Sequence, residues 1–264
     1  MTNARDQRNR ALLDWYDEHR RDLPWRREPD PYVTLVAEAM LQQTQVDRVI
    51  PKFEAWMSTW PHVAALASAT NDDVLAAWSG LGYNSRAIRL RDAARAIDEQ
   101  GWPSSIEGLQ ALPGVGPYTA AAIGSIAFGW GVPAVDTNLK RVLGRWHGAP
   151  LSGARLADYA DDVVTEPAGE WNQALMDLGA TTCRPTNPRC GECPVEAWCA
   201  DPTVYTPPPR QSTFEGSNRQ LRGALVKAHL AGTDLATTGR DLGRGDEETT
   251  ATIATLRDEG LISD

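Results

Sequence analysis

The chain has 264 residues, 42% of them hydrophobic, which is ordinary for a globular protein with one large or two smaller cores. No apolar run approaches the roughly 20 residues that span a bilayer, and the first residues, MTNARDQRNR, are polar. Composition therefore argues against a membrane protein and favours an intracellular one.

The formal net charge of −9 argues at first against a nucleic-acid partner, since phosphate binding draws on Lys and Arg. The charge is unevenly distributed, however, because six acidic residues face a single arginine between positions 150 and 182. Small basic groups occur at 86–95, 140–145 and 184–189. Each group is either a solvated helix face or part of a surface that binds phosphates.

Residues 8–200 have the pattern of an all-α protein, with frequent Ala and Leu and with Pro or Gly between segments. The first informative helix is DPYVTLVAEAMLQQTQ, where Asp30 and Pro31 suit N-cap and first-turn positions. Glu38 shares a helix face with Leu35 and Leu41, and the helix is apolar nearly all round, so it should be buried and the pKa of the carboxyl raised. A buried, protonated carboxyl suits a general acid. The alternative is that Glu38 is exposed or pairs with an arginine such as Arg26.

The segment ALPGVGPYTAAAIGSIAFG, residues 111–129, predicts two helices joined by a tight turn. Gly114 and Gly116 bracket Val115, and Pro117 suits the first position of the second helix. Glycines at such a place let backbone amides at a helix N-terminus approach an anion, for which a phosphate is the natural ligand. An ordinary helix-turn-helix corner is the alternative.

The segment AVDTNLKRVLGR, residues 134–145, begins a further predicted helix. Asp136 precedes the helical run, and in isolation it is best interpreted as an N-cap that accepts the early amide hydrogen bonds.

All four cysteines of the chain occur within seventeen residues, in a C-x6-C-x2-C-x5-C pattern. Two disulfides in so short a stretch of an enzyme-sized chain would be unusual, so we interpret the pattern as a metal site. Four thiolates suit zinc or a four-iron cluster. Because only one C-x2-C pair is present, the spacing favours an iron–sulfur cluster and leaves zinc as the alternative. The predicted ligands are Cys183, Cys190, Cys193 and Cys199.

Residues 202–217 have the Pro, Ser, Thr and Gly content of a linker. The sequence after it predicts three short helices near 218–231, 234–242 and 246–260. We therefore expect a first domain over 1–201, a linker over 202–217 and a small helical module over 218–264. The module resembles a winged-helix domain that lacks most of its wing, and a simple packing appendage is the alternative.

From about residue 8 to 200 the chain resembles the endonuclease III superfamily. The ordered features that carry the resemblance are L-P-G-V-G-P-Y-T-A, then V-D-T-N-x-x-R-V, then the cysteine pattern. The resemblance implies a two-part helical DNA glycosylase fold with a helix-hairpin-helix motif that binds the DNA backbone through the amides of Gly114, Val115 and Gly116. It also implies a [4Fe–4S] cluster held by the four cysteines.

Individual residues indicate which members of the superfamily are most similar. Tyr118 stands where bifunctional members carry a Schiff-base lysine, which implies a monofunctional glycosylase. The segments LPWR and DPYVTLVAEAMLQQTQ resemble MutY-type adenine DNA glycosylases, which remove adenine opposite 8-oxoguanine or G. By that resemblance, Glu38 protonates the base, Asp136 stabilises the sugar cation, and Tyr118 and Asn138 orient this pair. The resemblance further implies that Gln43 enters the base stack and that Trp25 and Arg26 line the base pocket.

The chain departs from the MutY pattern in two ways. Its tail is too short for the Nudix-like domain with which those enzymes recognise 8-oxoguanine, and G-L-G-Y-N, with Tyr83 and Asn84, replaces the usual G-L-G-Y-Y. Two alternatives therefore stay open: a mismatch glycosylase for T or U opposite G or for a damaged base, and a non-catalytic iron–sulfur protein that binds DNA or senses redox state. In every case we expect a monomer in the prokaryotic cytoplasm, associated with the nucleoid, that binds mismatched or damaged duplex DNA and no membrane.

Overall fold

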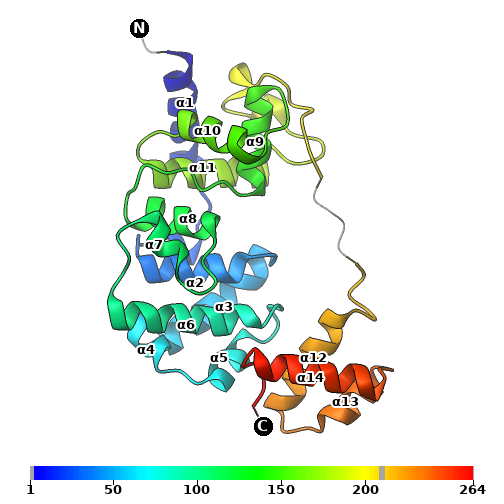
Figure 1. The fold of residues 1–264 in the computed structure, drawn as a ribbon. Coiled ribbons are helices and arrows are strands. Elements are labelled where there is room, and N and C mark those ends of the chain that lie inside the picture. Colours follow the sequence, from blue (N-terminus) through cyan, green and yellow to red (C-terminus); the bar gives the residue numbers. More distant parts are fainter. Residues whose placement is uncertain (1–2, 208–211, 264) are drawn as a thin grey trace. The chain divides into compact units, whose positions relative to one another are not determined.

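The computed structural model describes residues 3–207 and 212–263, and all regular structure in these two stretches is helical (Figure 1). The predicted all-α fold is therefore confirmed, with no strand among these residues. None of the helices in this part of the chain is both long and apolar enough to cross a membrane. The α-helices are α1 (Ala4–His19), α2 (Pro31–Leu41), α3 (Val46–Thr59), α4 (Val63–Ala67), α5 (Asn71–Trp78), α6 (Ser85–Gln100), α7 (Ile106–Gln110), α8 (Pro117–Ala127), α9 (Thr137–His147), α10 (Gly153–Val163), α11 (Ala168–Thr181), α12 (Asn218–Leu230), α13 (Leu235–Asp241) and α14 (Asp246–Asp258).

The chain forms two compact units that are interleaved in sequence. Unit 1 comprises Met1–Leu35, Ser104–Gln110 and Val115–Pro209, and unit 2 comprises Val36–Pro103, Ala111–Gly114 and Arg210–Asp264. The helix α2 thus starts in unit 1 and ends in unit 2. The domain boundary that the sequence predicts at 202–217 stays a prediction.

Unit 1 is built around α1, α9 and α11. Leu12 of α1, Val142 of α9 and Leu175 of α11 are fully buried in one apolar cluster. The helix α9 ends at Gly148, whose φ of 80° gives the left-handed C-terminal turn that glycine adopts without strain. The core therefore holds α9, which carries Asp136 at its N-terminus, against α11.

The first part of unit 2 packs α3 and α5 together and α4 against α6. Its aromatic centre is Trp56, whose ring lies edge-on to Trp60 and Trp78 at centroid distances of 4.6 and 5.6 Å. Offset and edge-on ring pairs of this kind contribute about 0.5–1.5 kcal/mol each beyond the area that they bury. This centre holds α5, and with it the turn that leads into α6.

The C-terminal part of unit 2 is a cluster of α12, α13 and α14 (orange to red in Figure 1). The residue bounds of these helices differ by at most two positions from those of the three predicted helices. Leu221, Leu225 and Leu256 form its buried interior. The side chain of Asn71, at the start of α5, donates a hydrogen bond to the carbonyl of Gly260. The three helices are therefore joined to the rest of unit 2 by packing and polar contacts.

Candidate active site and cysteine loop

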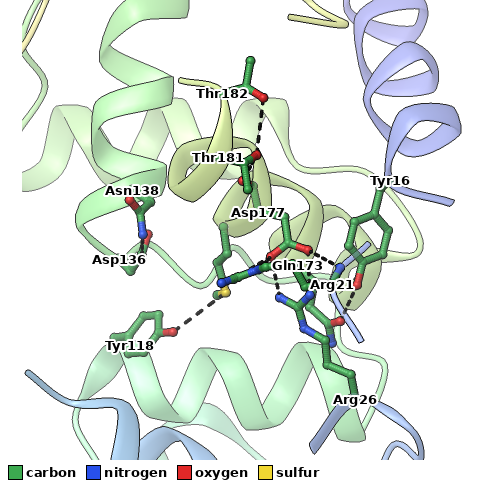
Figure 2. A network of polar contacts seen from close by, with 11 residues as sticks. Tyr16, Arg21, Arg26, Tyr118, Asp136, Asn138, Gln173, Asp177, Thr181 and Thr182 are labelled. Carbon is green, nitrogen blue, oxygen red and sulfur yellow. Dashed lines mark hydrogen bonds and ion pairs between the residues drawn. The ribbon is translucent and has the colours of Figure 1, made fainter. Parts of the chain in front are cut away.

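Asp136 is the N-cap of α9, as the sequence predicts. One carboxylate oxygen accepts a hydrogen bond from the amide of Leu139 at 2.7 Å, and the other accepts from Asn138 Nδ2 at 2.9 Å (Figure 2). Burial raises the pKa of Asp136 above its ordinary value, although these hydrogen bonds oppose the rise because they favour the ionised form. The carboxylate is thus poorly solvated but held in one orientation by its own helix.

Asn138 connects Asp136 to the loop that carries the cysteines. Its Oδ1 accepts from Arg141 Nη2 at 2.9 Å, and the same guanidinium donates to the carbonyls of Gly179 at 2.7 Å and Cys183 at 2.9 Å. A Cβ on Gly179 would lie 2.6 Å from Asn138 Cβ, so only glycine allows α11 to approach α9 this closely. The structure therefore brings together two of the predicted catalytic residues, Asp136 and Asn138.

Tyr118 is the second residue of α8, and its hydroxyl lies 4.0 Å from Met176 Sδ on α11 (Figure 2). Ala121, Ala122 and Ala134 form the small apolar cluster against which Tyr118 and Met176 pack. The ring is therefore half-buried within unit 1, the unit that also holds Asp136.

Glu38 lies one turn before the end of α2 and is 7% exposed, so its predicted burial is confirmed. Arg86 holds the end of this helix, because its Nη1 donates to the carbonyls of Ala39 at 2.8 Å, Met40 at 3.3 Å and Gln42 at 2.7 Å. The last carbonyls of a helix have no partner within the helix, so these bonds satisfy acceptors that would otherwise be left unpaired. Arg86 thereby fixes the turn that follows Glu38.

Arg86 also holds the turn before α6. Its Nη2 donates to the carbonyls of Leu81 at 3.0 Å and Gly82 at 2.9 Å, and its guanidinium lies 5.2 Å from the centroid of the Trp78 ring. Burial lowers the pKa of Arg86 to about 10. In the sequence Arg86 is one member of the basic group at 86–95. Its role in holding two chain turns depends on which carbonyls it contacts, and the sequence does not indicate these.

The hairpin between α7 and α8 has the predicted backbone. Gly114 has a φ of 76°, and a Cβ added there would lie 2.9 Å from Arg89 Cβ. Gly116 is extended and precedes Pro117, the first residue of α8, without a side chain that caps the helix. Val115 is buried. The start of α8 is therefore a helix N-terminus without a capping side chain at Gly116, which is the kind of site that suits a phosphate.

Arg26 and Trp25, predicted to line a base pocket, lie in the short helical turn Pro24–Arg26. Trp25 is buried, and Arg26 forms a two-bonded ion pair with Asp177, at 2.7 and 3.0 Å. Arg21 Nε donates to the same carboxylate at 2.7 Å (Figure 2). Although burial opposes it, these guanidinium groups hold the pKa of Asp177 below its ordinary value. The partner of Arg26 is thus Asp177, which lies in the acidic stretch between positions 150 and 182.

Gln43 and Tyr83, predicted to contact DNA, are exposed residues with left-handed backbone, at φ of 57° and 49°. Non-glycine residues rarely adopt this conformation, and it concentrates at functional sites. Asn84 follows Tyr83 as the residue before α6, and its side chain makes no capping hydrogen bond.

The four cysteines border one cavity of about 180 Å³ in unit 1. Arg145, a fully buried residue of α9, donates to Cys183 Sγ at 3.0 Å and to the carbonyls of Arg184 at 2.9 Å and Pro185 at 3.2 Å. Burial raises the pKa of the Cys193 thiol to about 11. In the described part of the chain, no group of three or more His, Cys, Asp or Glu side chains is placed to hold a metal ion. The four predicted ligands thus border the same cavity, but the structure does not show which metal or cluster they bind.

Comparison with known proteins places the chain in a family. Its residues 36–156 match the model of the HhH-GPD superfamily base excision DNA repair proteins. It is 43% identical to the adenine DNA glycosylase of Mycobacterium tuberculosis over 243 residues, which are 86% of this chain and 79% of that protein. The chain belongs to the HhH-GPD superfamily of base excision DNA repair proteins. The resemblance inferred from the sequence is therefore confirmed, and DNA is the partner of this chain.

Other superfamily members show how widely the fold is shared. The chain is 46% identical to the human adenine DNA glycosylase over 209 residues, 72% of this chain and 38% of that protein. A solved thermostable thymine-DNA glycosylase superimposes with a TM-score of 0.69 at 28% identity, over 75% of this chain and 98% of its own. The matched range 36–156 contains Glu38, the hairpin and Asp136, and it ends before the cysteine loop.

Proposed function

We propose that the chain is a monofunctional DNA glycosylase that removes adenine mispaired with 8-oxoguanine or G. The observation that carries the proposal is a carboxyl group buried at position 38, in a chain whose relatives at 42–46% identity are adenine DNA glycosylases. Hydrolysis of an N-glycosidic bond needs a protonated leaving group and stabilisation of positive charge on the sugar. Glu38 and Asp136 supply these two functions.

In this mechanism Glu38, protonated in its apolar helix, donates its proton to the adenine of an extruded nucleotide. The bond between C1′ and the base nitrogen then breaks, and the neutral base departs. Ionised Asp136 stabilises the cation at C1′ until a water adds there and passes its proton to a carboxylate. Asn138 keeps Asp136 oriented through the 2.9 Å bond, and the amides at the start of α8 bind the backbone phosphate.

The absence of a lysine at position 118 supports hydrolysis without strand cleavage, since Tyr118 offers no amine that could form a Schiff base. The structural likeness to a thymine-DNA glycosylase keeps T opposite G as the second candidate substrate. Retention of Glu38 together with the LQQTQ segment favours adenine.

We propose that the cysteine cavity holds a [4Fe–4S] cluster, with Cys183, Cys190, Cys193 and Cys199 as ligands. The donor set suits such a cluster in its chemistry, because four thiols border one cavity and Arg145 donates a hydrogen bond to one of the sulfurs, although the four side chains are not placed to hold a metal ion in this structure. When bound, the cluster would cross-link the loop and hold it against α9. Brown colour with broad visible absorption and about four irons per chain would support the cluster, and one zinc per chain would overturn it. We also propose that the enzyme acts on nucleoid DNA in the cytoplasm and that it does so as a monomer.

The substrate is tested with labelled duplexes that hold A opposite 8-oxoguanine, G or C, and T or U opposite G. We expect abasic product from the first two alone, with strand cleavage only after alkali. Release of T or U in place of adenine would support the second candidate, and a nick without alkali would indicate a lyase. No release from any duplex would favour the non-catalytic alternative.

A further inference from the structure

Unit 2 contains a groove of about 430 Å³ between the turn before α6 and the start of α12. One wall is formed by Gln43 and by residues 81–85, which include the predicted DNA contacts Tyr83 and Asn84. The other wall belongs to the C-terminal part of unit 2, the helices α12 and α14 and the residues next to them, to which the predicted activity assigns no role. The residues of that wall are Phe214, Arg219, Arg222, Gly223, Val226, Leu256 and Leu261.

Two aromatic rings at this groove are exposed to solvent. Tyr83 is 42% exposed and Phe214 is 61% exposed, and they are the two exposed large hydrophobic residues of the described chain. Arg219 donates to the Tyr83 hydroxyl at 3.3 Å and to the carbonyl of Ser212, two residues before Phe214, at 2.7 Å. The carbonyl of Phe214 accepts from the hydroxyl of Ser217, the N-cap of α12, at 2.6 Å. The Tyr83 ring is therefore held by a hydrogen bond to its hydroxyl, and Phe214 is held through its backbone carbonyl.

The charge at the groove differs from that of the whole chain. Arg48, Arg219 and Arg222 line it and no acidic residue does, although the chain carries a net charge of −9. Arg222 forms an ion pair with Glu259 at 2.5 Å, and Arg219 makes the hydrogen bonds to Tyr83 and Ser212 described above. Exposed aromatic rings beside arginines are the pattern with which proteins bind unstacked nucleotides, because rings stack on bases and arginines pair with phosphates.

We propose that this groove binds one unstacked nucleotide of the DNA, next to the point where Gln43 enters the stack. The base stacks on Phe214 and Tyr83, and its phosphate pairs with Arg219. The C-terminal helices are then a second DNA-binding element of the enzyme. This inference rests on the proposed function, since it assumes that the chain opens duplex DNA at a mismatch.

The test is carried out on the full chain, with duplex binding followed by fluorescence anisotropy over a range of salt concentrations. Phe214→Leu removes the ring from an exposed position, and we expect affinity for an A·8-oxoguanine duplex to fall roughly tenfold with an unchanged salt slope. Phe214→Trp should restore affinity. Arg219→Gln should lower the slope of log affinity against log salt by about one, as the loss of one phosphate contact requires.

Lys227→Gln is the matched control, because Lys227 is an exposed cation of α12 outside the groove. Wild-type affinity and salt slope in Phe214→Leu and Arg219→Gln would overturn the proposal, as would a change in oligomeric state without a change in DNA affinity. If these variants bind weakly as expected but the wild type releases no adenine, the proposed function fails and the groove assignment stands.

Discussion

The two candidate catalytic carboxylates lie near helix ends that are held in different ways. Asp136 is itself the N-cap of α9, and its partners are the residues two and three positions further along the chain. Glu38 lies near the C-terminal end of α2, and that end is held by Arg86, which is 44 to 47 residues away in sequence. One carboxylate is therefore positioned by local chain geometry, and the other depends on a tertiary contact.

The largest effect should follow from removing the proton donor while α2 is left intact. Glu38→Gln keeps the size of the side chain but cannot protonate a base, so we expect single-turnover adenine release to fall by about 10²- to 10⁴-fold. Duplex affinity should stay within a few-fold of wild type. Glu54→Gln, an exposed change on α3, is the control. A Glu38→Gln enzyme with near-normal release would remove Glu38 from the mechanism.

Asp136→Asn separates charge from capping at the other carboxylate. Asparagine is as good an N-cap as aspartate, so α9 should keep its start and the melting temperature should change little. Loss of the negative charge beside C1′ should slow release by about 10²- to 10³-fold. Asp234→Asn repeats the change at the exposed N-cap of α13 and should leave the rate unaltered. An Asp136→Asn enzyme with a wild-type release rate would mean that the charge of Asp136 is not needed and that the residue acts only as a helix cap.

The same distinction explains what the sequence predicted and what it did not. The cap at Asp136, the glycine turn at Gly114 and the burial of Glu38 each depend on residues within a few positions, so pattern and propensity are sufficient. The bonds from Arg86 to the end of α2 and from Arg26 to Asp177 join distant segments. A charged residue in a sequence does not indicate whether it faces solvent or buried carbonyls.

The groove at Phe214 shows the same limit more clearly. The linker composition of 202–217 predicted only a connection, and the three following helices were predicted close to their observed positions. That Arg219 meets the hydroxyl of Tyr83, 136 positions earlier, follows from the packing of the two parts of unit 2. The DNA-binding role that we propose for the C-terminal helices could therefore not be predicted from their own pattern.

Arg86→Met tests the tertiary side of the comparison. Without its guanidinium, the carbonyls at the end of α2 and in the turn before α6 lose their donor, so we expect the free energy of unfolding to fall by about 3 kcal/mol. Adenine release should also slow, because the turn after Glu38 is no longer fixed. Arg86→Lys, which keeps the charge but loses the two-pronged donor, should lie between. Denaturant unfolding provides the measurement.

Arg240→Met is the control for Arg86→Met, since the side chain of Arg240 is 55% exposed and its surface ion pairs contribute little. If Arg86→Met unfolded like wild type while its release rate fell, Arg86 would act on Glu38 alone and the helix end would not need its donor. If both quantities were unchanged, the contrast between the two helix ends would be wrong.

The smallest effect is expected at Asn138, one of the two sequence neighbours that hold Asp136. Burial already raises the pKa of Asp136, and the hydrogen bond from Asn138 opposes that rise. Asn138→Ala should therefore raise the pKa of Asp136 further. Because the proposed mechanism needs the ionised carboxylate, the acid limb of the pH–rate profile should move to higher pH, with a loss of about fivefold on that limb, as expected for one hydrogen bond.

The sign of the accompanying stability change is also fixed. A carboxyl whose pKa is higher in the folded than in the unfolded state costs stability where it is ionised, and this cost disappears as the pH falls below the unfolded value. Asn138→Ala should thus be less stable than wild type near neutral pH and closer to it in acid. Asn218→Ala, at the exposed start of α12, should shift neither curve. An unmoved acid limb in Asn138→Ala would mean that the hydrogen bond from the amide of Leu139 is sufficient to orient Asp136. Asp136 would then depend on the backbone of its own helix and on no side chain.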